Sequence, residues 1–225
     1  CCTVTIMAAD GGPQPEAPGR GDSTLLIQFA PEPGEGRVKK PLLNAQSPAQ
    51  ASALQCELVE GVCQRLWQAR LGPVTLAVTG DPSHPLFRRC LALGVENIDV
   101  QQGGDLGVRM ARAIAAGLKE YKAVLLVGSD CPGMDAAYLQ RARAALERAP
   151  VVLGPATDGG YVLVGSRVDR IDMFEDIPWG TEEVRWLTRK RFRDAGLSWL
   201  EMEPLEDIDV PEDLPLWQAL RGGAG

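Results

Sequence analysis

The segment 123–165 constrains the fold more than any other stretch, because its apolar runs lead directly into acidic turns. Residues 124–127 are all apolar, and the chain then continues as Gly128-Ser129-Asp130. Such a run is typical of a buried parallel strand that brings an acidic residue to its carboxyl end. Ligands of open α/β sheets bind at that edge, so the sequence predicts that Asp130 lies beside a ligand.

The second acidic turn reads T-D-G-G-Y, in which Asp158 is followed by Gly159 and Gly160. Paired glycines permit a tight turn and let another molecule approach the backbone closely. Asp158 is therefore a candidate for orienting an acceptor hydroxyl or for acting as a general base. The alternative is that Asp158 only supplies the local hydrogen bond of an Asp-Gly turn.

The rest of the chain alternates short apolar runs with amphipathic segments. Strands are predicted at 24–29, 74–78, 97–100, 124–127, 151–153, 161–164 and 198–202. The predicted helix N-caps are Ser47 with Gln50 in a capping box, Asp105, Asp135 and Thr181, and a last helix is predicted from about Pro211. This alternation predicts a three-layer α/β/α fold with a mostly parallel sheet.

The 225 residues fit one large α/β domain, predicted at 23–221, after a Gly- and Pro-rich leader at 1–22 that is expected to be disordered. The formal net charge of −7 argues against nucleic acid or an anionic membrane as a partner. No stretch suits a membrane span or a secretory signal, so a cytoplasmic location is expected. The sequence gives no indication of the oligomeric state.

Six cysteines without a C-x-x-C pair, together with the single histidine His84, argue against a Cys/His zinc site. Cys131 follows Asp130, but no base is evident for it, so a packed thiol is expected rather than a nucleophile. His84 is expected to be inert in a surface loop.

Asp130 is a candidate ligand for Mg²⁺ or Mn²⁺, with the metal bridging a diphosphate. The alternative is an aspartate that only caps a turn. A second acidic cluster, 207–213, contains Asp209 just before the helix predicted from Pro211. Asp209 can face the same cation, or it can simply cap the following helix together with Glu212.

The Pro- and Gly-rich loop 31–42 follows the first strand and contains Arg37, Lys39 and Lys40. Its backbone N–H groups and its cations can cradle phosphates. It is not a Walker A sequence, because it lacks G-K-[ST]. The alternative is a basic loop that is merely solvated.

Several motifs occur in an order that resembles the DUF2064 family. They are Q-Q-G-G-D-L-G-V-R-M (101–110), G-S-D-C-P (128–132), G-P-A-T-D-G-G-Y-V-L-V-G (154–165), F-E-D-I-P-W-G-T (174–181) and D-I-D-V-P-E-D-L (207–214). This family is glycosyltransferase-A (GT-A)-like, includes radical-SAM- and selenodomain-associated transferases, and is similar to the molybdenum-cofactor and phospholactate guanylyltransferases. The resemblance covers about residues 24–220, and several motifs in order are more specific than any one alone.

The resemblance implies a GT-A fold, a nucleotide-activated donor and a bound Mg²⁺ or Mn²⁺. It places Asp130 and Asp209 at the metal and makes Asp130 and Asp158 the catalytic candidates. The nucleotide-binding candidates are Phe29, Ala30, Gly36, Arg37, Lys39, Arg109, Ser129 and Asp130. The acceptor-side candidates are Asp158, Gly159, Gly160, Trp179, Gly180 and Thr181. The implied partners are a nucleotide-sugar or nucleoside triphosphate donor and a small-molecule acceptor.

The first loop departs from the family pattern F-A-K-x-P-x-P-G-x-V-K-T-R-L. Here Pro31 replaces the early lysine, Glu35 replaces a proline, and Lys40-Pro41 replaces Thr-Arg. A charge-assisted phosphate contact is worth about 1.5–3 kcal/mol, so losing one or two can cost roughly tenfold to a thousandfold or more in donor affinity. This change suggests an altered donor or lost catalysis.

The expected function is therefore that of an enzyme, a metal-dependent glycosyltransferase that moves a sugar from a nucleoside-diphosphate sugar to a small acceptor. One alternative is a nucleotidyltransferase acting on a phosphorylated small molecule. A nucleotide-sugar-binding protein without catalytic activity is the other.

Overall fold

A computed structural model describes residues 23–34 and 47–208 of the chain. The strands are β1 (Thr24–Pro31), β2 (Val74–Thr79), β3 (Asn97–Val100), β4 (Ala123–Val127), β5 (Val151–Pro155), β6 (Tyr161–Ser166) and β7 (Trp199–Glu201). The helices are α1 (Pro48–Ala69), α2 (Pro85–Ala92), α3 (Leu106–Gly117), α4 (Ala136–Ala145) and α5 (Val184–Asp194), with a short 3₁₀ helix, η3 (Ile171–Phe174). The leader 1–22, the helix predicted near Pro211 and the domain end at 221 lie outside the described residues.

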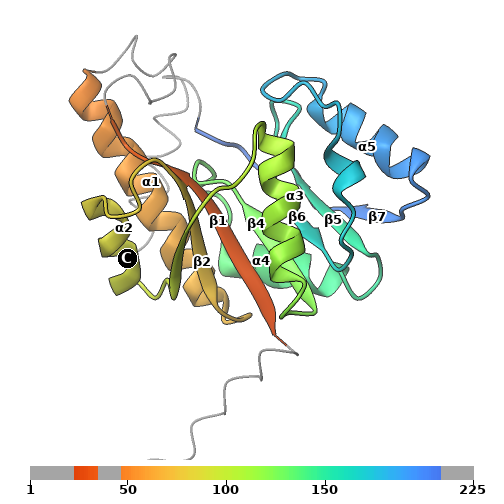
Figure 1. The fold of residues 1–225 in the computed structure, drawn as a ribbon, viewed down its shortest axis with the longest axis horizontal. Helices are drawn as coiled ribbons and strands as arrows, with labels where there is room; N and C mark the ends of the chain where they lie inside the picture. The colour runs from red at the N-terminus through yellow and green to blue at the C-terminus, as the bar shows by residue number, and fades with distance from the viewer. Residues whose placement is uncertain (1–22, 35–46, 209–225) are drawn as a thin grey trace, which may run out of the picture.

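The strands form one sheet in the order β3-β2-β1-β4-β6-β5-β7 (Figure 1). The pairs β1–β2, β1–β4, β2–β3 and β5–β7 are parallel, and only β6 runs against its neighbours. The prediction of a mostly parallel sheet is confirmed. All seven strand predictions correspond to observed strands, several of which extend one or two residues further than expected.

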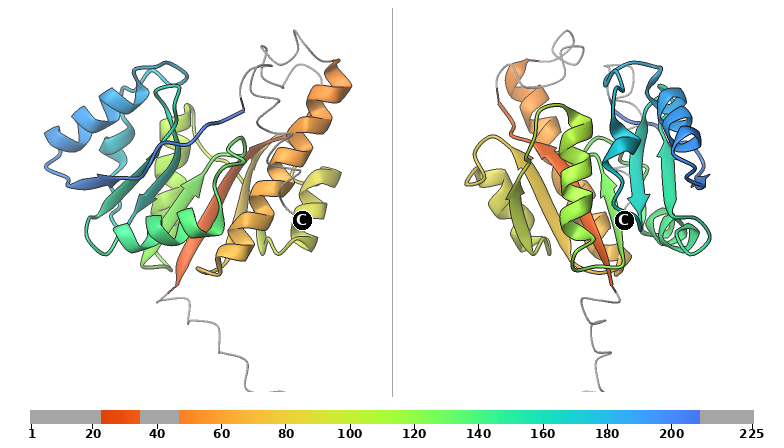
Figure 2. Two further views of the ribbon diagram at one scale, coloured as in Figure 1. Left: turned by 180° about the vertical axis from the view of Figure 1, so that it is seen from behind. Right: turned by 45° about the vertical axis from the view of Figure 1, so that its right-hand side comes forward.

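Helices cover both faces of the sheet, which confirms the three-layer fold (Figure 2). Alternate residues of β1 pack on opposite faces of the sheet. Leu26 packs toward α1, α2 and α4, whereas Ile27 packs toward α3, η3 and α5. Successive side chains of a strand point to opposite faces, so a strand buried on both sides is mostly apolar along its length. Within the described residues, no helix combines the length and the apolar character that crossing a bilayer requires.

Most of the predicted helix starts are confirmed. Ser47 accepts from Gln50 N–H while the Gln50 side chain accepts from Ser47 N–H, and Asp105 and Asp135 cap α3 and α4. The cap predicted at Thr181 is wrong, because α5 begins three residues later and the Thr181 hydroxyl donates to the Pro178 carbonyl at 2.9 Å. His84 caps α2, since its Nδ1 accepts from Leu86 N–H at 3.2 Å.

A buried amide joins the first strand to its surroundings. Gln28 is fully buried, and its Nε2 donates to the Val59 carbonyl at 3.0 Å and to Ser129 Oγ at 2.9 Å. Its Oε1 accepts from Cys63 Sγ at 2.9 Å. A buried polar side chain is tolerated when its hydrogen bonds are made, so this amide connects β1, α1 and the turn after β4.

Replacing this amide tests its contribution to stability. We expect Gln28→Met, which keeps the side-chain length, to lower the free energy of unfolding by about 1–3 kcal/mol, because buried partners lose their hydrogen bonds. Urea unfolding followed by circular dichroism measures the change. The matched control is Gln68→Met on the exposed face of α1, which we expect to stay within about 0.5 kcal/mol of the parent. Equal changes in the unfolding free energy of the two variants would contradict a stabilising role for the hydrogen bonds of Gln28.

Candidate functional site

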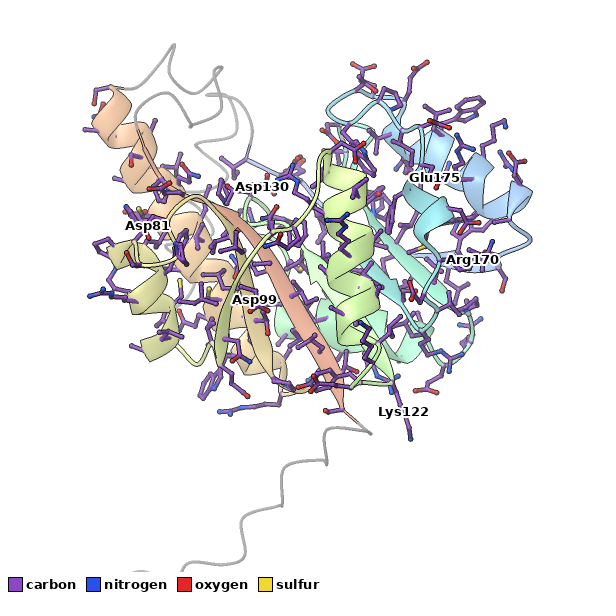
Figure 3. The ribbon with its side chains drawn as sticks, viewed as in Figure 1. Asp81, Asp99, Lys122, Asp130, Arg170 and Glu175 are labelled. Atoms are coloured by element: carbon purple, nitrogen blue, oxygen red, sulfur yellow. The ribbon has the colours of Figure 1, made fainter. Side chains whose placement is uncertain are left out.

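The turn after β4 holds Asp130 at the carboxyl end of the parallel strands (Figure 3). Gly128 N–H donates to the Val162 carbonyl at 3.1 Å, and Ser129 Oγ donates to the Phe29 carbonyl at 2.8 Å. A Cβ at Gly128 would lie 2.9 Å from Asp130 Oδ1, so glycine leaves room for the carboxylate. The backbone of β1 and β6 therefore determines where Asp130 lies.

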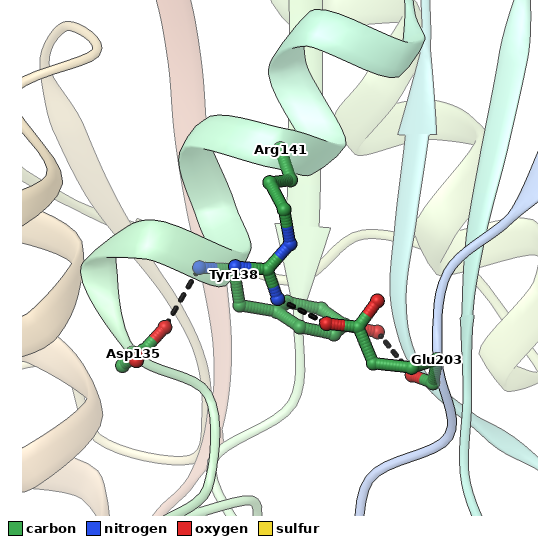
Figure 4. Close-up of polar contacts among 4 residues, drawn as sticks. All are labelled: Asp135, Tyr138, Arg141 and Glu203. Carbon is green, nitrogen blue, oxygen red and sulfur yellow. Dashed lines mark hydrogen bonds and ion pairs between the residues drawn. The ribbon is translucent and has the colours of Figure 1, made fainter.

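The segment 203–208 returns from β7 to this turn. Tyr138 Oη donates to the Glu203 carbonyl at 3.1 Å, and Arg141 pairs with the Glu203 carboxylate, as Figure 4 shows. Farther along, Leu205 exchanges backbone hydrogen bonds with residues on either side of Ala156. Ile208 N–H then donates to the Asp130 carbonyl at 2.8 Å. This bond brings Asp207 and Ile208, the first residues of the second acidic cluster, to the turn that carries Asp130.

A cavity of about 420 Å³ lies beside this junction. Asp130, Asp158 and Asp207 all line it, although they come from three separate parts of the chain. Of the predicted acceptor-side residues, the cavity is lined by Asp158, Gly160, Trp179, Gly180 and Thr181. The structure thus brings together one predicted metal ligand and most of the predicted acceptor-side residues. Their roles remain predictions.

The turn around Asp158 is fixed by local and long-range contacts. Asp158 Oδ1 accepts from Gly160 N–H at 2.8 Å, which is the turn chemistry expected of Asp-Gly sequences. Gly159 has φ +98°, and a Cβ there would lie 2.5 Å from the Glu182 carbonyl. Its own carbonyl accepts from Arg185 N–H at 3.0 Å. Gly159 therefore joins this turn to the start of α5, and Asp158 stays exposed at the cavity rim.

An aromatic cluster forms one wall of the cavity. The Trp179 ring lies 6.2 Å from Tyr161 in an edge-to-face arrangement and 6.3 Å from Phe174. A Cβ at Gly107 would lie 2.8 Å from Trp179 Cζ2 and 2.7 Å from the Phe174 carbonyl. The absence of a side chain at Gly107 therefore lets Trp179 approach α3 closely.

Tyr161, the aromatic residue edge-to-face with Trp179, is a neutral group. Burial raises the pKa of its phenol, so the hydroxyl stays protonated at neutral pH.

Arg109 lies on the opposite side of α3. Its Nη1 donates to Gln101 Oε1 at 2.9 Å and its Nε to the Asp105 carbonyl at 3.2 Å, while Gln101 Nε2 donates to the Ala77 carbonyl at 2.9 Å. A second cavity, of about 620 Å³, is lined by Gln101, Arg109 and Phe29, and Phe29 also lines the first cavity. Arg109 is thus held near the carboxyl ends of β1 and β2.

Ser129 and Cys131, which flank Asp130, are both committed to internal contacts. The Ser129 hydroxyl accepts from Gln28 Nε2 and donates its proton to the Phe29 carbonyl, so it has no proton left to donate to a nucleotide. Burial, reinforced by the Asp130 carboxylate, raises the pKa of the Cys131 thiol to about 12. The thiol therefore stays protonated at neutral pH, as expected of a packed cysteine rather than a nucleophile.

The remaining predicted site residues are only partly covered by the structure. Ala30 lies buried near the end of β1. Gly36, Arg37, Lys39 and Asp209 lie outside the described residues. Ile208, whose N–H reaches Asp130, directly precedes Asp209 in the sequence.

A known protein family matches the central part of this chain. Residues 62–181, more than half of the sequence, match DUF2064, described as an uncharacterized protein conserved in bacteria. The chain belongs to the DUF2064 family. A search of curated proteins found no relative.

Solved structures share the fold of this DUF2064 chain. A Desulfovibrio desulfuricans G20 protein assigned as a nucleotide-diphospho-sugar transferase is 27% identical at a TM-score of 0.80, covering 92% of this chain and 90% of that one. CMP:2-keto-3-deoxy-manno-octonic acid synthetase complexed with CTP is 15% identical at 0.56, covering 89% and 98%. Rv0371c of Mycobacterium tuberculosis H37Rv complexed with manganese is 17% identical at 0.54, covering 89% and 98%. The chain therefore has the nucleotide-diphospho-sugar transferase fold.

Three residues of this DUF2064 site were not predicted from the sequence. Asp207 lines the cavity, although only Asp209 was singled out from the same acidic cluster. Gln101 orients Arg109, and the missing side chain of Gly107 makes room for Trp179. The sequence showed Gln101 and Gly107 only as members of the 101–110 motif and gave them no role. Asp207 could have been predicted from its spacing, because it lies two positions before Asp209 and residues two apart in an extended chain point to the same side.

Gly107→Ala tests how closely Trp179 must approach α3. We expect a loss of about 1–3 kcal/mol in stability, because the new methyl group meets the indole and a backbone carbonyl. The control is Gly61→Ala in α1, where the nearest atom is the far end of Arg65, and a gain of about 0.5–1 kcal/mol is expected. Chemical denaturation measures both variants, and a gain at both positions would contradict the close packing.

Proposed function

We propose that this chain is a metal-dependent transferase that moves a sugar from a nucleoside-diphosphate sugar to the hydroxyl of a small acceptor. The observation that carries the proposal is the hydrogen bond from Ile208 N–H to the Asp130 carbonyl. It brings two acidic segments together at the carboxyl ends of parallel strands, where ligands of such sheets bind. Asp158 lines the same cavity and supplies an acidic group for the acceptor.

The carboxylates present suit a hard divalent cation. Asp130 and Asp207 line one cavity, and Asp209 is the further candidate next to Ile208. The described residues contain no cluster of three or more such ligands. Mg²⁺ is usually held by one or two carboxylates plus substrate phosphates, so this donor set fits the proposal. When bound, such a cation neutralises the charge of the departing diphosphate.

The donor would lie along the carboxyl ends of β1, β2 and β4. Arg109 is a cation near these strand ends, and its hydrogen bond to Gln101 holds the guanidinium in place. Phe29, Ala30 and the backbone of Ser129 are the neighbouring candidates, and Gly36, Arg37 and Lys39 complete the proposed donor site. Relatives support a nucleotide donor, since one is assigned as a nucleotide-diphospho-sugar transferase and another is complexed with CTP.

The residues of this chain would perform three tasks in the transfer. Asp158 orients the acceptor hydroxyl and takes its proton. The acceptor oxygen forms a bond to the anomeric carbon while the bond from that carbon to the donor phosphate oxygen breaks, and the nucleoside diphosphate leaves. Gly160, Trp179, Gly180 and Thr181, together with the adjacent Gly159, would enclose the acceptor and limit the entry of water.

Nucleotidyl transfer is the second candidate, because the synthetase complexed with CTP shares the fold. In that reaction a substrate phosphate attacks the α-phosphorus of a nucleoside triphosphate and releases pyrophosphate. Calorimetric titration with UDP-sugars, GDP-sugars and nucleoside triphosphates, with and without Mn²⁺, separates the two. Metal-dependent binding of a nucleotide sugar supports glycosyl transfer, whereas triphosphate binding with pyrophosphate release supports the second candidate. No binding by folded protein would contradict both.

Asp130→Asn tests the metal assignment. We expect metal-dependent donor binding to weaken at least about tenfold, because a neutral amide no longer balances the cation. The control is Asp169→Asn, an exposed aspartate outside the cavity, which we expect to bind donor as the parent does. Titration of each variant with the best donor and Mn²⁺ gives the result. Unchanged binding by Asp130→Asn would overturn the assignment of Asp130 to the metal.

A further inference from the structure

The cavity beside Asp130 has two chemically distinct parts. Its rim carries the carboxylates Asp130, Asp158 and Asp207, whereas its interior is apolar. The interior is formed by side chains from α3, β4, β6 and α5, notably Leu106, Met110, Leu126, Val164 and Val184. A pocket of this kind binds an apolar body and fixes a polar group at its mouth.

The described lining residues include no lysine, arginine or histidine. Phosphate and carboxylate groups are normally held by such cations, often through paired hydrogen bonds. The Asp158 carboxylate would instead repel an anionic acceptor. A cation shared by Asp130, Asp207 and the donor phosphates would still leave the charge of Asp158 uncompensated.

Two helices begin at this cavity, but their N-termini do not make it attractive to an anionic acceptor. The first residues of α3 and α5, Leu106 and Val184, both line it, and helix N-termini attract anions. However, the Asp105 carboxylate already accepts from Val108 N–H at the start of α3. At α5, two glutamates directly precede Val184. Carboxylates of the chain thus already occupy or flank both helix starts.

We infer that the acceptor is an uncharged hydroxy compound with an apolar body, rather than a phosphorylated or carboxylated molecule. The apolar body would lie between α3 and α5, against Leu106 and Trp179, which line the cavity and are only half-buried. Its hydroxyl would meet Asp158, whose Oδ1 is held by Gly160 N–H and whose Oδ2 has no hydrogen bond to the described residues. The inference deepens the proposed glycosyl transfer and rests on it for the identity of the reacting group.

Three probes separate the classes of acceptor. They are 3-phenylpropane-1,2-diol, which is neutral and apolar, glycerol, which is neutral and polar, and glycerol 3-phosphate, which is anionic. Binding of each is measured by calorimetry or ligand-observed NMR, first without and then with donor and Mn²⁺. We expect the phenyl diol to bind at least tenfold more tightly than either of the others. Equal or tighter binding of glycerol 3-phosphate would overturn the inference.

A matched pair of variants locates the binding. Leu106 and Leu118 are half-buried leucines at the two ends of α3 and pack against the same hydrophobic cluster, but only Leu106 lines this cavity. Leu106→Lys should weaken binding of the phenyl diol at least tenfold and strengthen binding of glycerol 3-phosphate, whereas Leu118→Lys should change neither. If the lysine variant does not fold, Leu106→Trp fills the cavity without charge and should also abolish diol binding. Unchanged diol binding in a folded Leu106 variant would contradict the location.

Donor titration of the same samples keeps the two proposals apart. The proposed function fails if no nucleotide sugar binds in the presence of Mn²⁺, whatever the acceptor result. The acceptor inference fails if donor binds normally but the anionic probe is preferred. Both variants of Leu106 should retain donor binding, because the donor site is built from the strand ends and from Arg109.

Discussion

One backbone hydrogen bond, from Ile208 N–H to the Asp130 carbonyl, joins two of the three parts of the chain that make the acidic rim of the cavity. The bond involves main-chain atoms on both sides and uses neither aspartate side chain. The contacts of Glu203 and Leu205 hold the approaching segment in position before it reaches Asp130. Geometry at the rim is therefore set by the backbone, whereas chemistry is supplied by the side chains.

The opposite wall depends on packing rather than on hydrogen bonds. Trp179 Nε1 is buried without a partner among the described residues, so its position is determined by contact with Gly107, Phe174 and Tyr161. Leaving a buried donor unpaired costs about 1–3 kcal/mol, which close aromatic packing must offset. The cavity thus has one wall fixed by directional bonds and another fixed by shape.

Local features of the structure could be predicted from the sequence. Ser47, Asp105 and Asp135 were identified as caps because a capping side chain bonds within three residues of itself. The apolar runs predicted the strands, since a strand buried on both faces is mostly apolar along its length. Thr181 was misassigned because its hydroxyl found a carbonyl in the preceding turn, a choice that spacing alone does not reveal.

Contacts between distant segments could be predicted only in outline. The sequence indicated that Asp130 and the 207–213 cluster converge, but it did not show that Asp207 lines the cavity. It also did not show that Gln101 holds Arg109, because that pair depends on the distance between β3 and α3. The role of Gly107 was likewise unpredictable, since it depends on an indole seventy-two positions later in the chain.

The path of the 203–208 segment bears on how the protein is made. The central strands β1, β2 and β4 and the helices between them are complete by residue 127. A domain generally folds as a unit, and its N-terminal part is synthesised first. The rim beside Asp130 therefore stays incomplete until Ile208 has been added. Substrate binding is thus among the last properties that the nascent polypeptide acquires.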